Sequence, residues 1–226
     1  AKPLVYCADA SPEGFDPGLW DSSATGNVTS QMFQGLLAFK RGGTELVASL
    51  ATAWTVSPDA RSFTFTLRRG VKFHTTPWFT PSREMNADDV LFSLRRMLDK
   101  THFAHAAARN GFVYWEGMGM GSLVKAVDKL DALTVRITLA RPEAPFLADL
   151  AISAIGSVFS AEYAEQLRAA GRLEDLNTRP VGTGPFVLKS YQKDAVIRYT
   201  PHPGYWGGAP ALDALVFAIT VDPDVR

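Results

Sequence analysis

The sequence has little that would mark a membrane protein or a nucleic-acid-binding protein. It contains no uninterrupted apolar run of the roughly 18 residues that a membrane-spanning helix needs, so membrane insertion is not expected. Lys and Arg together number 23, as do Asp and Glu, and the formal net charge is zero. Nucleic-acid-binding proteins usually carry a basic excess. No nucleic-acid partner is therefore expected.

Recognisable catalytic motifs are also missing. The sequence has no Gly-x-Ser-x-Gly element of the kind that presents a nucleophilic serine. The stretch Gly117–Gly121 lacks the Lys-Ser/Thr pair of a phosphate-binding loop, and we expect a flexible loop there. The carboxylates of predicted helices are scattered and are interpreted as solvated charges: Glu143, Asp149, Glu162 and Glu165. We therefore expect no enzymatic activity and no catalytic residue.

Histidine is scarce, with 4 residues in the chain. His102 and His105 are spaced to share one helix face, but metal sites usually need about three or four ligands and no further His or Cys lies near them. We expect a solvated or locally hydrogen-bonded pair and no metal site. His74 is interpreted as a structural residue at a strand end. The aromatic group Phe112, Tyr114 and Trp115 is compatible with either a pocket wall or core packing.

A single cysteine, Cys7, falls in a strand predicted over Leu4–Cys7. Composition favours a small buried thiol, because free cysteines are usually buried. In a secreted protein, however, a lone cysteine indicates a missing partner. The start Ala1–Leu4 carries no basic-then-apolar leader, so it fits either a cytosolic start or a mature start after signal removal.

What is present is a chain able to fold. The 226 residues are 46% hydrophobic, which allows one large domain or two small ones with a real core. Residues Ser62–Arg68 alternate between apolar and polar, which predicts a strand with one buried face. Asn86 is placed to cap a helix whose first turn holds Asp88 and Asp89. That helix has a predicted buried stripe made of Val90, Leu91, Leu94, Met97 and Leu98.

Further elements follow from spacing and turn residues. A helix is predicted after residue 25, with Val28, Met32, Phe33 and Leu36 at helical intervals, and a loop over Ser11–Gly18. Helices are predicted at Pro145–Ala154 and Ala161–Ala170, and the second would begin after the cap Ser160 and end at Gly171. Strands are predicted at Val124–Asp128, Leu133–Leu139, Phe186–Lys189, Ala195–Thr200 and Leu215–Thr220. Late strands without covering helices indicate part of a larger fold.

Three ordered blocks carry a family resemblance. The first block, Leu50–Ser93, includes Trp54, a Ser-Pro-Asp turn, the alternating strand and the run Asn-Ala-Asp-Asp-Val. The second is Pro180–Phe186, followed by Tyr191. The third is Tyr205-Trp206-Gly207, followed by Pro210, Asp213 and Phe217–Thr220. The chain resembles the family 5 solute-binding proteins of ABC transporters, the peptide/nickel group. Segments around Cys7–Phe15, Trp115–Gly119 and Arg141–Leu150 are most similar to its dipeptide-binding members.

The resemblance implies an α/β fold. Its parts would be a periplasmic-binding-protein type II-like lobe, with a mixed sheet and flanking helices, and an inserted α+β subdomain. Residues 1–38 and 177–226 would form the first part of ligand-binding lobe I, residues 39–176 the insertion, and the second lobe would be absent. The implied protein is a periplasmic, monomeric binding component with its signal peptide removed. It would deliver dipeptides, or alternatively longer peptides, haem or nickel complexes, to a membrane permease, and would require no cofactor. A hydrolase domain is the alternative from a different functional class.

The resemblance also implies a site. The family's lobe I contact segment corresponds to Asp21, Ser22, Ser23, Ala24 and Thr25, whose small side chains suit a ligand held by main-chain hydrogen bonds. Dipeptide-binding members usually have a Ser-Gly-Thr-like run here, and this chain departs from it. The anchors for the peptide termini would lie in the other lobe. Cys7 would form a disulfide with a partner beyond residue 226, in an oxidising compartment.

Overall fold

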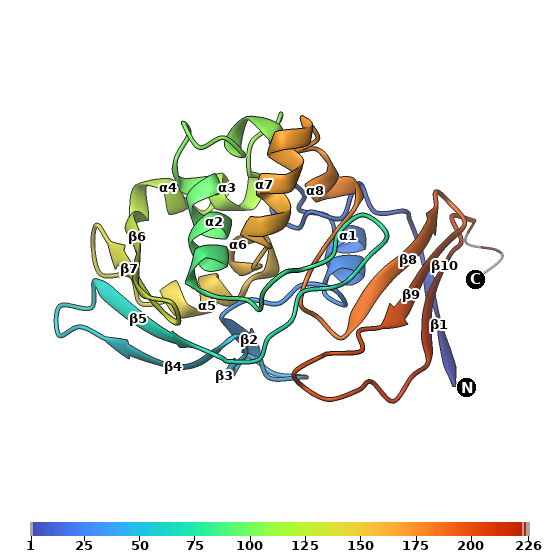
Figure 1. Ribbon diagram of the computed structural model, residues 1–226, viewed down its shortest axis with the longest axis horizontal. Coiled ribbons are helices and arrows are strands. Elements are labelled where there is room, and N and C mark those ends of the chain that lie inside the picture. The colour runs from blue at the N-terminus through green and yellow to red at the C-terminus, as the bar shows by residue number, and fades with distance from the viewer. Residues whose placement is uncertain (1, 223, 225–226) are drawn as a thin grey trace.

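The computed structural model describes residues 2–222 and 224, which form a mixed α/β structure with two four-stranded sheets (Figure 1). This confirms the predicted α/β class. The strands are β1 (Pro3–Ala8), β2 (Leu37–Phe39), β3 (Leu46–Ala48), β4 (Ala51–Val56), β5 (Ser62–Leu67), β6 (Val124–Asp131), β7 (Thr134–Leu139), β8 (Phe186–Gln192), β9 (Val196–Pro201) and β10 (Ala214–Ile219). The helices are α1 (Ser23–Thr29), α2 (Ala87–Leu98), the 3-10 helix η1 (His105–Ala107), α3 (Val113–Gly117), α4 (Met120–Leu123), α5 (Phe146–Ala151), α6 (Ser153–Gly156), α7 (Ala161–Ala170) and α8 (Asp175–Thr178).

The first sheet has the strand order β1-β10-β9-β8. Strand β1 runs parallel to β10, with Leu4 opposite Leu215, whereas the other pairs are antiparallel. Alternate residues of β10 are buried, which gives this sheet one core face. All three late strands predicted from the sequence are therefore confirmed, within two or three residues at their ends.

Strand β1 lies at the edge of this sheet, and Cys7 is exposed there. The interpretation of Cys7 as a buried thiol is therefore wrong: the strand prediction is right, but most of β1 faces solvent, including Leu4, Val5 and Tyr6. The disulfide partner implied for Cys7 falls beyond the chain, and residues 223, 225 and 226 near its end lie outside the described residues.

The second sheet is antiparallel throughout, in the order β4-β5-β7-β6. In β5 the side chains of Phe63, Phe65 and Leu67 are buried and the intervening residues are not, as the alternation predicts. Helix α2 covers the sheet through its apolar stripe, and the strands β6 and β7 form the predicted hairpin. Sequence analysis missed β4 and the small β2–β3 hairpin.

Three helix boundaries predicted from capping and stop residues are confirmed. The Asn86 side chain accepts a hydrogen bond from the Asp88 backbone N–H. The Asp89 carboxylate accepts one from the Asn86 backbone N–H, which completes a capping box. Ser160 accepts from the Tyr163 N–H at 3.0 Å. Gly171 ends α7 in a left-handed conformation with φ of 66°, which glycine adopts without steric cost.

Other helix predictions need correction. The predicted helix Pro145–Ala154 is two short helices, because the backbone is extended at Ile152 (ψ 126°). Helix α1 ends at Thr29, so Met32, Phe33 and Leu36 pack into the core from irregular backbone after the helix. In the second case the apolar spacing identified buried residues correctly but overestimated the helix length. Gly117–Gly121 is not a loop: it spans the end of α3 and the start of α4, joined at Gly119 with φ of 67°.

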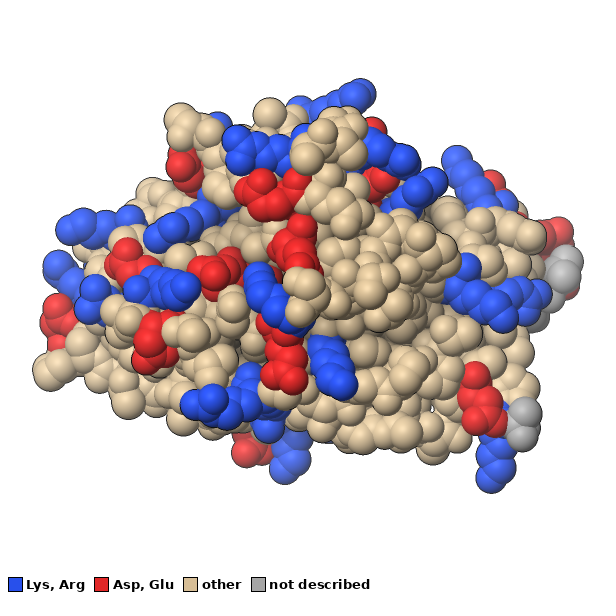
Figure 2. Space-filling view, viewed as in Figure 1, with Lys and Arg blue, Asp and Glu red and all other residues tan. Residues whose placement is uncertain are grey.

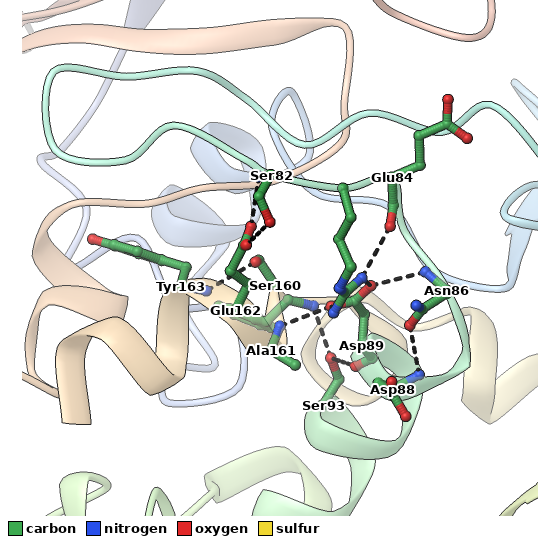
Figure 3. Close-up of polar contacts among 12 residues, drawn as sticks. Ser82, Glu84, Asn86, Asp88, Asp89, Ser93, Ser160, Ala161, Glu162 and Tyr163 are labelled. Atoms are coloured by element: carbon green, nitrogen blue, oxygen red, sulfur yellow. Dashed lines mark hydrogen bonds and ion pairs between the residues drawn. The ribbon is translucent and has the colours of Figure 1, made fainter. Parts of the chain in front are cut away.

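Helices α2 and α7 meet at a buried carboxylate (Figure 3). Asp89 is fully buried and accepts hydrogen bonds from the backbone N–H groups of Asn86 (2.9 Å) and Ala161 (2.8 Å). The Arg83 guanidinium donates to both Asp89 oxygens, at 2.7 and 2.9 Å. Beside this pair the Ser82 hydroxyl and backbone N–H donate to Glu162, so Glu162 is not simply a solvated charge.

The region between the two sheets is packed too closely for larger residues. A Cβ at Gly182 would lie 2.0 Å from the Met32 carbonyl oxygen, and one at Gly184 2.7 Å from the Met32 carbonyl carbon. The buried His74 ring, which lies in the loop after β5 and not at a strand end, accepts from the Gly182 N–H through Nδ1 and donates to the Gly184 carbonyl through Nε2. Its structural role is confirmed.

Charged side chains gather on one part of the visible face (Figure 2). Lys and Arg side chains are interleaved with Asp and Glu in Figure 2, and a broad part of that face carries neither sign. Among the described residues, no helix is both long and apolar enough to span a bilayer.

Candidate ligand-binding segment

The segment Asp21–Thr25 forms the turn into α1. Ser22 is the N-cap residue of α1, and its hydroxyl accepts from the Thr25 N–H at 3.2 Å. Thr25 is buried, and its own hydroxyl accepts from the Glu13 N–H at 3.2 Å. The backbone of this segment is therefore held by local polar contacts, while Asp21 and Ser23 remain exposed.

A cavity of about 190 Å³ opens beside this segment. Three parts of the chain that are far apart in sequence meet at it. Its lining consists of Pro17, Trp20, Asp21, Ser22, Thr25, Gly26, Tyr114, Ile152, Ser153 and Ala154. The segment thus lies against a concave surface with both polar and apolar lining residues.

The structure brings some predicted site residues to this cavity and not others. Asp21, Ser22 and Thr25 line it, whereas Ser23 and Ala24 do not. Sequence analysis missed Trp20 and the α5–α6 junction, because no motif marks them. Of the aromatic group left open between pocket and core, Tyr114 lines the cavity, and Phe112 and Trp115 are buried.

The loop leading to this segment is anchored by Asn177. The Asn177 side-chain oxygen accepts from the backbone N–H groups of Phe15 (3.1 Å) and Asp16 (3.0 Å) and from the Trp20 indole N–H (3.1 Å). A Cβ at Gly14 would lie 2.1 Å from the same oxygen, so glycine is required there for this approach. Asn177 thereby fixes the loop and the Trp20 ring together.

A buried ion pair ties the same loop to α2. Arg96 donates to both oxygens of Asp16, at 2.6 and 2.9 Å, and both side chains are almost completely buried. The Arg96 guanidinium also stacks over the rings of Phe112 and Phe159, at 5.0 and 4.2 Å from their centroids. This bidentate geometry leaves little freedom at the base of the loop.

The two spaced histidines are locally hydrogen-bonded, as expected. His102 Nδ1 accepts from the Ala104 N–H at 3.1 Å, and His105 Nδ1 lies 2.8 Å from the Arg96 carbonyl oxygen. Burial lowers the pKa of His102. Within the described part of the chain, no group of three or more His, Cys, Asp and Glu residues is arranged to hold a metal ion.

Comparison with known proteins identifies the family. Residues 45–226 match the model described as bacterial extracellular solute-binding proteins, family 5 Middle. The chain belongs to this family. Over its whole length it is 54% identical to a di/tripeptide-binding protein 4 of Pseudomonas aeruginosa and 48% identical to a dipeptide-binding protein of Escherichia coli. It is also 45% identical, over 99% of its length, to a heme-binding protein A of Haemophilus influenzae.

Solved structures of family 5 members share the fold. A dipeptide-binding protein of Pseudoalteromonas sp. SM9913 in complex with Met-Leu superposes with a TM-score of 0.96 at 37% identity, over 100% of this chain and 44% of that one. HbpA2 of Haemophilus parasuis gives a TM-score of 0.95 at 39% identity, over 99% of this chain and 44% of that chain. The chain spans 42% of the length of the curated Pseudomonas and Escherichia relatives.

Proposed function

We propose that this family 5 chain is part of the substrate-binding component of an ABC importer that captures di- and tripeptides in the periplasm. The observation that carries this proposal is the 54% identity to a di/tripeptide-binding protein, which extends over the entire chain. The peptide would be released to a membrane permease, with no covalent chemistry. Because the family is extracellular, the mature protein would have lost a signal peptide.

We propose the segment Asp21–Thr25 as this chain's part of the peptide site. Its position supports this: it borders the cavity that Trp20 and Tyr114 also line. Peptides bound in such clefts pair mainly through main-chain hydrogen bonds, which small neighbouring side chains permit. Asp21, Ser22 and Thr25 would contribute directly at the cavity, and Ser23 and Ala24 through the turn they form.

The domain assignment is part of the same proposal. Residues 1–38 and 177–226 would belong to lobe I and residues 39–176 to its inserted subdomain. The two four-stranded sheets support this division, since β1 and β8–β10 come entirely from the first set and β4–β7 entirely from the second. The remaining length of the relatives would supply the second lobe, and closure would be a hinge motion.

The proposed function is tested by calorimetric titration of a protein that includes this chain and has the full length of its relatives. We expect a dipeptide and a tripeptide to bind more tightly than a pentapeptide or haemin. Haemin is included because a heme-binding protein A is 45% identical. Tighter binding of haemin would overturn the peptide assignment in favour of that alternative, and turnover of any peptide would favour a hydrolase. Micromolar dipeptide binding by residues 1–226 alone would contradict a site that needs both lobes.

A matched pair of variants tests the segment. Gly26 lines the cavity and has open space where a Cβ would lie, so Gly26→Trp should fill the cavity and weaken peptide binding by about tenfold or more. Asn27, its exposed neighbour on α1, does not line the cavity, and Asn27→Trp is the control. Equal affinities for the two variants would exclude this cavity as the peptide site.

A further inference from the structure

A second cavity shares Trp20 with the first. It has a volume of about 230 Å³ and lies between the loop before α1, the region around η1, and α8. Figure 1 shows that the loop before α1 passes beside α8. Much of the lining is apolar and includes Leu19, Trp20, Ala107, Phe112, Leu173 and Leu176.

The charged residues at this cavity leave no net charge to attract an ion. Asp16 and Arg96 at its base bind each other with two hydrogen bonds and are 2% and 3% exposed. The other two charged residues of the lining, Arg109 and Glu174, are exposed and of opposite sign. A neutral, apolar group is therefore the best match to this surface.

The wall formed by Trp20 is rigid. Its indole N–H donates to Asn177, whose oxygen also holds the backbone of residues 15 and 16. Trp20 directly precedes Asp21 in the chain and lines both cavities, so the two cavities adjoin at its ring. The volume is larger than the roughly 150 Å³ apolar cavity that is known to accept benzene.

We infer that this second cavity is a side-chain pocket that accepts an aromatic or large aliphatic side chain of the peptide held at Asp21–Thr25. This inference rests on the proposed function. The pocket gives the protein a preference for peptides with one bulky apolar residue. Burying such a side chain corresponds to an affinity gain of about ten- to a hundredfold over alanine.

The experiment is calorimetric titration of the full-length protein with Ala-Ala, Ala-Phe and Phe-Ala. We expect one of the two aromatic peptides to bind about ten- to a hundredfold more tightly than Ala-Ala. Ala107→Phe, which fills the cavity from η1, should reduce this affinity ratio towards one. Ala106 is exposed, adjacent in η1 and not part of the lining, so Ala106→Phe should keep the wild-type ratio.

A second variant covers a failure of Ala107→Phe to fold. Leu173→Ala enlarges the cavity and should raise the affinity for Ala-Trp, or for Trp-Ala, relative to its phenylalanine counterpart. If wild type shows no aromatic preference, or if Ala107→Phe and Ala106→Phe keep the same ratio, the pocket assignment is wrong while peptide binding stands. If none of the peptides binds, the proposed function itself fails and the pocket falls with it.

Discussion

Asp16 and Asp89 are chemically alike and do different work. Each is a buried aspartate that accepts hydrogen bonds from both terminal nitrogens of an arginine. Asp16 accepts from Arg96, and Asp89 accepts from Arg83. Asp89 and Arg83 are six residues apart and stabilise the junction of α2 with α7 (Figure 3). Asp16 and Arg96 are 80 residues apart and fix the loop that leads to the candidate ligand-binding segment.

The difference lies in what surrounds the arginine. The Arg83 side chain is 32% exposed and Asp89 has two backbone N–H partners besides it. The Arg96 side chain is 3% exposed and lies between two aromatic rings. When both members of an ion pair are buried, removing one leaves the other as an unpaired buried charge, which is strongly destabilising. When the arginine is partly exposed, water can take its place beside the carboxylate, so removing it costs less. The comparison predicts an ordered series of effects.

The largest effect is expected from Arg96→Met. It leaves the Asp16 charge buried without its partner, which should cost about 3 to 5 kcal/mol of unfolding free energy. Urea denaturation measures it. The double variant Asp16→Asn/Arg96→Met removes the stranded charge and should regain part of the loss. Equal stabilities of the single and double variants would show that the stranded charge is not the cause.

The next effect is expected at His74, a buried side chain that hydrogen-bonds the backbone of Gly182 and Gly184 and no carboxylate. Burial, followed by the neighbouring His202, lowers the pKa of His74 from 6.5 to about 3. Between these values the unfolded chain takes up a proton that the folded chain excludes, so acidification destabilises the fold. The slope from His74 should be about 1.4 kcal/mol per pH unit. His74→Gln should flatten the urea-derived stability profile between about pH 4 and pH 6, and an unchanged slope would contradict it.

Arg83→Met should be milder than Arg96→Met. Asp89 keeps its hydrogen bonds from Asn86 and Ala161, and water can approach where Arg83 was partly exposed. The expected loss is about 1 to 2 kcal/mol in the same denaturation assay. A loss as large as that of Arg96→Met would mean that exposure of the arginine does not distinguish the two pairs.

The smallest effect is expected at the surface pair Lys129–Asp88. The two side chains are 42% and 49% exposed and 3.2 Å apart. Lys129→Met should change the unfolding free energy by less than about 0.5 kcal/mol. A measured change above that of Arg83→Met would break the ordering by burial that the comparison rests on.

Elements fixed by local signals could be predicted from the sequence. The alternation of β5, the capping box of α2 and the Ser160 cap and Gly171 stop of α7 all depend on neighbouring residues, and each is confirmed. Two helix boundaries were predicted wrongly. No capping residue or apolar spacing noted in the sequence marks the break at Ile152 or the early end of α1.

The candidate site was predictable only in part. The family resemblance pointed to Asp21–Thr25, and three of those five residues line a cavity. Trp20 and Tyr114 could not be chosen, because their importance comes from segments far apart in sequence meeting at one place. The anchoring role of Asn177 could not be predicted either, since the three groups that donate to its side-chain oxygen all lie more than 150 residues away.

The exposed strand β1 has a consequence for handling the protein. Leu4, Val5 and Tyr6 are 49%, 58% and 47% exposed on a strand that, among the described residues, pairs only with β10. Backbone groups along such an edge are a template on which another extended segment can add. A sample containing only residues 1–226 should therefore become turbid as its concentration rises, and a lysine in place of Val5 should keep it clear.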